Sequence, residues 1–288
     1  MTKSNTPQKN NSSNPDRTPV KKLRGIRLIV SDLDGTLFNN SLQLPDDLPE
    51  IVARLRENGI LFATASGRNW GSQKGFFPGL LDKITFICDN GAFIVQKQEP
   101  VFISSLSPGL WKSIVRKCNS YGDKCRAILC GVNGTYVTDY RHNAELQNVI
   151  DHFYMGLTVT PDLCSVQDEI FKVSICYLPG TGGSFYEDFY STYDSQANVL
   201  RTAECFMDIM NPDISKASGL QFLQSRYGIS PEETVTFGDF ENDISLFRQS
   251  KHSFLMENAP VHMRQYAKYT APSNDDNGVI RTIKKYIL

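Results

Sequence analysis

Short apolar runs alternate with amphipathic segments in the first third of the chain. Residues 26–31, 60–65 and 84–88 are rich in β-branched, aromatic and other apolar side chains, which is typical of buried strands. Between the first two runs, apolar residues recur at helical spacing, at Leu48, Ile51, Val52 and Leu55. An order of strand, helix and strand predicts a parallel sheet with right-handed crossovers.

The pattern changes between residues 106 and 197. An amphipathic helix is predicted around 110–118, and strand-like segments follow, the longest at 170–177. The α/β pattern resumes near residue 205, with a helix at 216–227 and further strands and helices up to the C-terminus. We therefore expect an α/β protein with a Rossmann-like parallel sheet, interrupted by an α+β insert.

Composition narrows the possible classes of protein. Residues 1–23 are polar and almost free of large apolar side chains, which predicts a disordered tail. The net charge of −1 provides no field for attracting nucleic acid or an anionic membrane, and no segment approaches the roughly 20 apolar residues of a membrane span. Seven cysteines without a C-x-x-C pair indicate free thiols in a reducing compartment. We expect a cytoplasmic protein without nucleic-acid or membrane partners.

The first apolar run ends in two carboxylates, Asp32 and Asp34, followed by Gly35 and Thr36. Carboxylates at the end of a buried strand lose hydration unless a cation holds them, and Mg²⁺ prefers oxygen ligands. The pair indicates a metal-assisted site with a carboxylate able to act as nucleophile or acid. The alternative interpretation is a simple Asp-Gly turn in which Asp32 caps a helix.

Three more polar segments follow predicted strands or open predicted helices. Ser66-Gly67-Arg68 has a hydroxyl and a backbone N–H suited to a phosphate oxygen, Lys216 opens a helix, and 238–243 reads G-D-F-E-N-D. Taken singly, each also fits a helix cap, a surface lysine or first-turn acids that favour the helix dipole. Together they indicate carboxylates, a hydroxyl and a lysine at one edge of a sheet.

These segments resemble, in this order, the four motifs of the haloacid dehalogenase superfamily: D-L-D-G-T-L, S-G-R, an isolated Lys and G-D-x-x-N-D. The resemblance covers nearly all of 24–288. Asn90-Gly91-Ala92, the segment 274–278 and the insert between the second and third motifs resemble the Cof-type phosphatases of subclass IIB. The resemblance implies a core domain formed by 24–105 and 198–288, and an α+β cap domain formed by 106–197.

The resemblance also implies a role for individual residues. Asp32 is the nucleophile and a ligand of Mg²⁺, and Asp34 is the general acid/base, with its backbone carbonyl on the metal. Asp239 is the third protein ligand, and Asp243 belongs to the metal site by orienting bound water or Lys216. The implied phosphate-binding residues are Leu33, Ser66, Gly67, Lys216 and Asn242. The implied substrate-proximal residues are Arg68, Asn90 and Gly91.

The expected function is Mg²⁺-dependent hydrolysis of small phosphorylated metabolites, sugar phosphates first, through an aspartyl phosphate. A cap over the site excludes protein substrates, so the expected partner is a small molecule, and the expected protein is a monomer or weak homodimer. A phosphomutase of the same subclass is an alternative, because water or a sugar hydroxyl attacks the same intermediate. A phosphate-binding protein without turnover is a second alternative.

Overall fold

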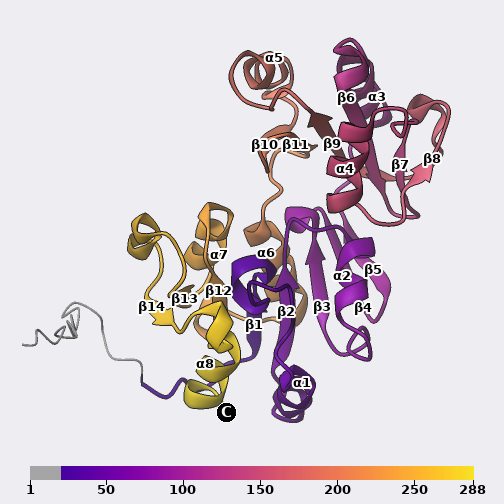
Figure 1. Cartoon of the computed structure of the whole chain (residues 1–288). Coiled ribbons are helices and arrows are strands. Elements are labelled where there is room, and N and C mark those ends of the chain that lie inside the picture. The colour runs from indigo at the N-terminus through magenta and orange to yellow at the C-terminus, as the bar shows by residue number, and fades with distance from the viewer. Residues whose placement is uncertain (1–20) are drawn as a thin grey trace, which may run out of the picture.

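The computed structural model describes residues 21–288, which form two β-sheets (Figure 1). The predicted tail therefore lies, for residues 1–20, outside the described residues. The larger sheet has the strand order β14-β13-β12-β1-β2-β3-β4-β5. Its strands are β1 (Leu28–Ser31), β2 (Leu61–Ala65), β3 (Thr85–Cys88), β4 (Phe93–Gln96), β5 (Glu99–Ile103), β12 (Thr234–Gly238), β13 (His252–Met256) and β14 (Tyr269–Ala271). The predicted parallel sheet is confirmed, with antiparallel pairing only at β3–β4 and β4–β5.

Helices cover both faces of this sheet because its strands are apolar on both sides. Leu28 and Val30 of β1 pack with α6 (Lys216–Tyr227) and α7 (Ile244–Arg248). Ile29 points to the other face, where it joins the cluster that contains α1 (Leu48–Glu57) and α8 (Gly278–Tyr286). The short α2 (Trp70–Phe76) follows β2. The arrangement is the α/β layer architecture expected from the sequence.

The smaller sheet lies beyond the end of the larger one in Figure 1 and has the order β10-β11-β9-β6-β7-β8. Its strands are β6 (Cys125–Gly131), β7 (Thr135–Val137), β8 (Thr158–Val159), β9 (Ile170–Tyr177), β10 (Asn198–Arg201) and β11 (Phe206–Met210). One face packs against α3 (Pro108–Asn119) and α5 (Gly183–Tyr193), and the other against α4 (Ala144–Phe153).

The smaller sheet extends beyond residue 197, where the sequence predicted the end of the cap domain. Strands β10 and β11 belong to the smaller sheet, where β11 pairs with β9, so residues 198–210 do not join the core sheet. Short apolar strands look alike in sequence whichever sheet they enter, because pairing is decided by partners distant along the chain. We propose 106–210 as the cap domain. Within residues 21–288, no helix is both long enough and apolar enough to cross a membrane.

Candidate active site

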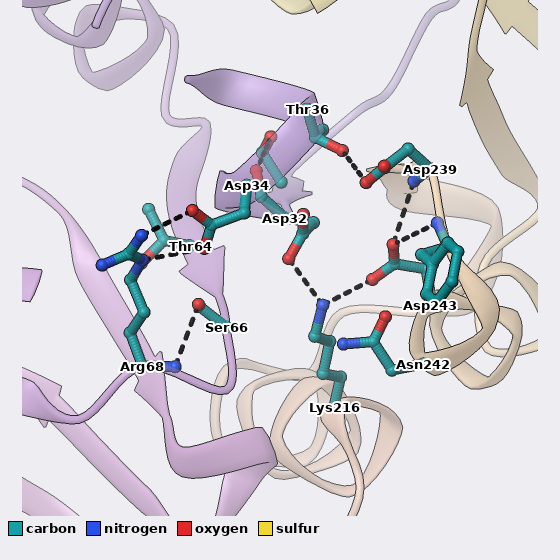
Figure 2. Close-up of polar contacts among 12 residues, drawn as sticks. Asp32, Asp34, Thr36, Thr64, Ser66, Arg68, Lys216, Asp239, Asn242 and Asp243 are labelled. Carbon is teal, nitrogen blue, oxygen red and sulfur yellow. Dashed lines mark hydrogen bonds and ion pairs between the residues drawn. The ribbon is translucent and has the colours of Figure 1, made fainter. Parts of the chain in front are cut away.

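The four polar segments singled out in the sequence meet at the carboxyl edge of the larger sheet (Figure 2). Strand β1 pairs in parallel with β2 on one side and β12 on the other. Because parallel strands end at the same edge, the residues that follow them, Asp32, Ser66 and Asp239, are brought side by side. Helix α6 begins at this edge and contributes Lys216.

Lys216 is the cation of the site and is 1% exposed. Its Nζ donates to Asp32 Oδ1 at 2.5 Å and to Asp243 Oδ1 at 2.7 Å. Burial opposes its charge, but the carboxylates of Asp243 and Asp32 outweigh burial and raise the pKa of Lys216, so the ammonium stays charged. Ser215 fixes the start of α6 directly before the lysine, because its side chain caps the helix in a reciprocal pair with Ser218.

Asp32, Asp239 and Asp243 each place a carboxylate oxygen within 4.8 Å of the others. Burial raises the pKa of Asp32 despite the nearby Lys216, and burial with the charge of Asp243 raises the pKa of Asp239 to about 6. Such a set of crowded, partly dehydrated carboxylates fits a hard divalent cation such as Mg²⁺.

The hydrogen bonds within the cluster distinguish its members. Asp243 accepts from Lys216 on Oδ1 and from the backbone N–H groups of Asp239 and Phe240 on Oδ2, at 2.9 and 3.2 Å. Asp239 accepts from the Thr36 hydroxyl on Oδ1 at 2.9 Å, which leaves Oδ2 for a cation. The geometry therefore suits Asp239 as a direct ligand and Asp243 as the residue that holds Lys216 and the Asp239 loop.

The Asp34 carboxylate points away from the cluster, toward Arg68 (Figure 2). Arg68 donates from Nε to Asp34 Oδ2 at 2.8 Å and from Nη2 to Oδ1 at 2.7 Å. The guanidinium also lies 5.4 Å from the ring centre of Phe76. This two-pronged contact fixes the Asp34 side chain on the side of the site away from Asp239 and Asp243.

The loop after β2, which is expected to bind phosphate, makes hydrogen bonds with the turn after β3. The Ser66 hydroxyl accepts from the backbone N–H of Arg68 at 3.1 Å, and Asn90 donates its backbone N–H to the Ser66 carbonyl at 2.9 Å. Gly91 has φ +102°, and a Cβ there would lie 2.2 Å from the carbonyl oxygen of Ser215. Asn90 and Gly91 thus lie against the loop and against the start of α6, and their proximity to substrate stays a prediction.

Three expected phosphate-binding residues are placed at the same edge. Leu33 is fully buried after β1, Gly67 lies against the Asn90 amide, and Asn242 lies beside Lys216 in Figure 2. Their contacts with a phosphoryl group remain predictions.

Asn258, which belongs to none of the four motifs, also contacts the site. Its side-chain amide donates to the Gly35 carbonyl at 2.8 Å, and its oxygen accepts from the backbone N–H of Asn274 at 3.0 Å. Asn274 in turn donates to the Phe38 carbonyl at 3.0 Å. These two asparagines hold the loop that carries Asp32 and Asp34. The available signal was position, because Asn258 follows β13 at the same sheet edge.

Comparison with known proteins agrees with this geometry. Residues 29–283 match the family described as haloacid dehalogenase-like hydrolase. A 5-amino-6-(5-phospho-D-ribitylamino)uracil phosphatase of Escherichia coli is 29% identical over 265 residues, which cover 91% of this chain and 96% of that protein. A phosphatase of the same name from Bacillus subtilis is 23% identical, over 90% of this chain and 97% of that protein.

Solved structures show the same fold. A haloacid dehalogenase-like hydrolase from Bacteroides thetaiotaomicron superposes with a TM-score of 0.77 at 22% identity, covering 90% of this chain and 99% of that one. A Thermotoga maritima protein superposes with a TM-score of 0.78, also at 22% identity, over 90% of this chain and 97% of that one. The chain therefore belongs to the haloacid dehalogenase-like hydrolases, in their Cof-type group of phosphatases.

Proposed function

We propose that this protein is a Mg²⁺-dependent phosphatase that hydrolyses small phosphorylated metabolites through an aspartyl phosphate on Asp32. The observation that supports this most directly is the contact of Lys216 with Asp32, inside a cluster with Asp239 and Asp243. A carboxylate nucleophile is repelled by a phosphate monoester dianion unless positive charge lies beside it. Lys216 supplies that charge within 2.5 Å of the nucleophile.

Mg²⁺ held by Asp32 and Asp239 would supply further positive charge at the transferred phosphoryl group. In the first step, an Asp32 oxygen forms a bond to phosphorus while the bond from phosphorus to the leaving oxygen breaks, and Asp34 gives its proton to that oxygen. In the second step, Asp34 takes a proton from water, whose oxygen attacks phosphorus and releases phosphate from Asp32. The two steps restore the enzyme and consume one water.

Asp34 must face the leaving oxygen in the first step, and its contact with Arg68 holds it elsewhere. Arg68 donates to both oxygens of Asp34, so neither oxygen is free for a leaving group. A bound phosphate dianion offers Arg68 another acceptor of the same two-pronged geometry. We infer that substrate binding draws Arg68 away from Asp34 and frees that carboxyl to serve as acid.

Sugar phosphates and phosphorylated polyols are the proposed substrates. The cap domain over the site favours a small leaving group, and two relatives are named for a phosphate of a ribityl chain, which is a polyol. The first panel should therefore hold hexose and pentose phosphates, polyol phosphates, 5-amino-6-(5-phospho-D-ribitylamino)uracil and p-nitrophenyl phosphate.

The test measures phosphate release from this panel with Mg²⁺ and with EDTA. With Mg²⁺ but not with EDTA, wild type should release one phosphate for each substrate molecule consumed. Asp32→Asn should fold normally and lose at least 99% of kcat. Asp188→Asn, which changes a half-exposed carboxylate in the cap, serves as the control and should keep full activity. Isomerised sugar phosphate without phosphate release would identify a mutase instead. An Asp32→Asn variant with more than a few per cent of wild-type kcat would refute covalent catalysis through Asp32.

A further inference from the structure

A buried ion pair joins the cap to the core. Lys172, in strand β9 of the cap, is 2% exposed, and its Nζ lies 2.6 Å from Oδ1 of Asp89, which follows strand β3 of the core. A second carboxylate, Asp208 of cap strand β11, lies 3.5 Å from the same ammonium. Lys172 is the one charged residue in the otherwise apolar and hydroxyl-bearing run of β9.

An irregularity in β9 brings Phe171 to the same face of the strand as Lys172. Gly131 of β6 pairs with Ile170 and Cys130 pairs with Lys172, so Phe171 is an extra residue between two paired positions. A bulge of this kind bends the strand and re-aims its side chains. As a result two successive residues contact the core: Lys172 meets Asp89, and the Phe171 ring stacks on Phe93 with ring centres 4.9 Å apart.

The core side of this contact is a strained turn. Asp89 and Asn90 have φ of +50° and +54°, a left-handed conformation that non-glycine residues rarely adopt. The backbone N–H of Asp89 donates to the Arg68 carbonyl at 3.1 Å, and that of Asn90 donates to the Ser66 carbonyl at 2.9 Å. The turn therefore carries the loop 66–68, and Lys172 holds the side chain of its first residue.

The charges make this contact dependent on the cap. Asp89 is fully buried and Asp208 is 4% exposed, so both carboxylates rely on Lys172 for a counter-charge. When the cap leaves the core, Lys172 leaves with it, and Asp89 is free to meet water. The turn is then held only from the core side, by its backbone hydrogen bonds and by its packing against α6 and the loop 66–68.

We propose that Lys172 is a positioning residue of the phosphatase reaction. With the cap closed, its ammonium pins Asp89, and the turn 89–90 then holds the loop 66–68 in the geometry that binds the phosphoryl group. Cap closure and phosphate affinity are thus coupled through a single ion pair. This inference rests on the proposed function, which assigns phosphate binding to Ser66 and Gly67.

The test is Lys172→Met, which keeps the length of the side chain and removes its charge. The matched control is Lys117→Met, which removes a lysine paired to Asp188 at 2.8 Å wholly within the cap. Binding of inorganic phosphate is measured by calorimetry with Mg²⁺ present, together with kcat and KM for p-nitrophenyl phosphate and for the best metabolite. Lys172→Met should weaken phosphate binding at least tenfold and raise KM for both substrates, and the control should change each by less than twofold.

Two results would overturn the inference. One is unchanged phosphate binding in Lys172→Met, whether or not its free energy of unfolding falls. That result would show that Lys172 contributes to stability alone. The other is a rise in KM for the metabolite alone, because Lys172 would then contact the leaving group.

If Lys172→Met does not fold, Lys172→Met with Asp89→Asn and Asp208→Asn leaves no charge at this contact. This triple variant should fold and still bind phosphate at least tenfold more weakly, and wild-type affinity in it would also refute the coupling. A wild-type protein without phosphatase activity would refute the proposed function but leave the calorimetric test intact.

Discussion

Replacement of Lys216 by methionine tests the electrostatic reasoning about the active site. The substitution keeps the apolar stem of a side chain that is 1% exposed and deletes an ammonium lying 2.5 Å from Asp32 and 2.7 Å from Asp243. Three carboxylates would then stand within 4.8 Å of one another without that cation. We expect Lys216→Met to be inactive and, without Mg²⁺, to be strongly destabilised.

The magnitude follows from the burial of all the partners. Removal of one member of a buried ion pair costs about 3–5 kcal/mol, because the other charge stays buried and unpaired. A domain is stable by only about 5–15 kcal/mol, so the loss is a large fraction of the total. Mg²⁺ at 100 times its dissociation constant stabilises the folded state by about 2.7 kcal/mol, because it binds that state and not the unfolded chain. The variant should gain more from Mg²⁺ than wild type does, because its site is more negative.

Urea unfolding followed by circular dichroism, in EDTA and in excess Mg²⁺, measures these differences. Lys117→Met is the control, since its lysine is partly exposed and pairs with a half-exposed carboxylate. A pair of that kind contributes about 0–1 kcal/mol. The reasoning would be refuted by a loss of less than about 1 kcal/mol for Lys216→Met in EDTA, or by a gain from Mg²⁺ smaller than that of wild type.

Three further predictions concern other parts of the molecule. In a Mg²⁺ titration of activity, Asp239→Ala should show no response to the metal, whereas Asp243→Ala should bind Mg²⁺ about 10–100-fold more weakly than wild type. Equal effects of the two substitutions would contradict their separate roles. Gly91→Ala should lower the free energy of unfolding by more than about 1 kcal/mol, measured in urea, because its Cβ meets the Ser215 carbonyl at 2.2 Å and φ is +102°. Burial and the charges of Lys268 and Lys251 lower the pKa of His252 from 6.5, so the unfolded chain takes up a proton first as pH falls, and stability is lost below about pH 6.5. Thermal unfolding should therefore show a smaller loss between pH 7 and pH 5 in His252→Gln than in wild type, and parallel curves would contradict this.

The sequence alone determined the sheet and the place of the site. The runs before Asp32, before Ser66 and before Gly238 predict buried strands, and the structure forms β1, β2 and β12 there. The signal is local, because burial on both faces makes a strand apolar throughout its length. Parallel strands end at one edge, so polar residues directly after them converge whatever the rest of the chain does. Lys216 was also found from sequence, since it opens a helix that follows the same pattern.

Only the tertiary structure decided contacts between residues distant along the chain. No sequence pattern marked Arg68 as the partner of Asp34, Lys172 as the partner of Asp89, or β11 as a neighbour of β9. A short strand or a charged side chain accepts many partners of similar energy, and its choice depends on which surfaces packing brings together. The contact between cap and core joins Lys172 and Phe171 of a cap strand to a strained turn and to Phe93 of the core. These residues are far apart along the chain, so the insert 106–197 showed its fold class in sequence but not its contact with the core.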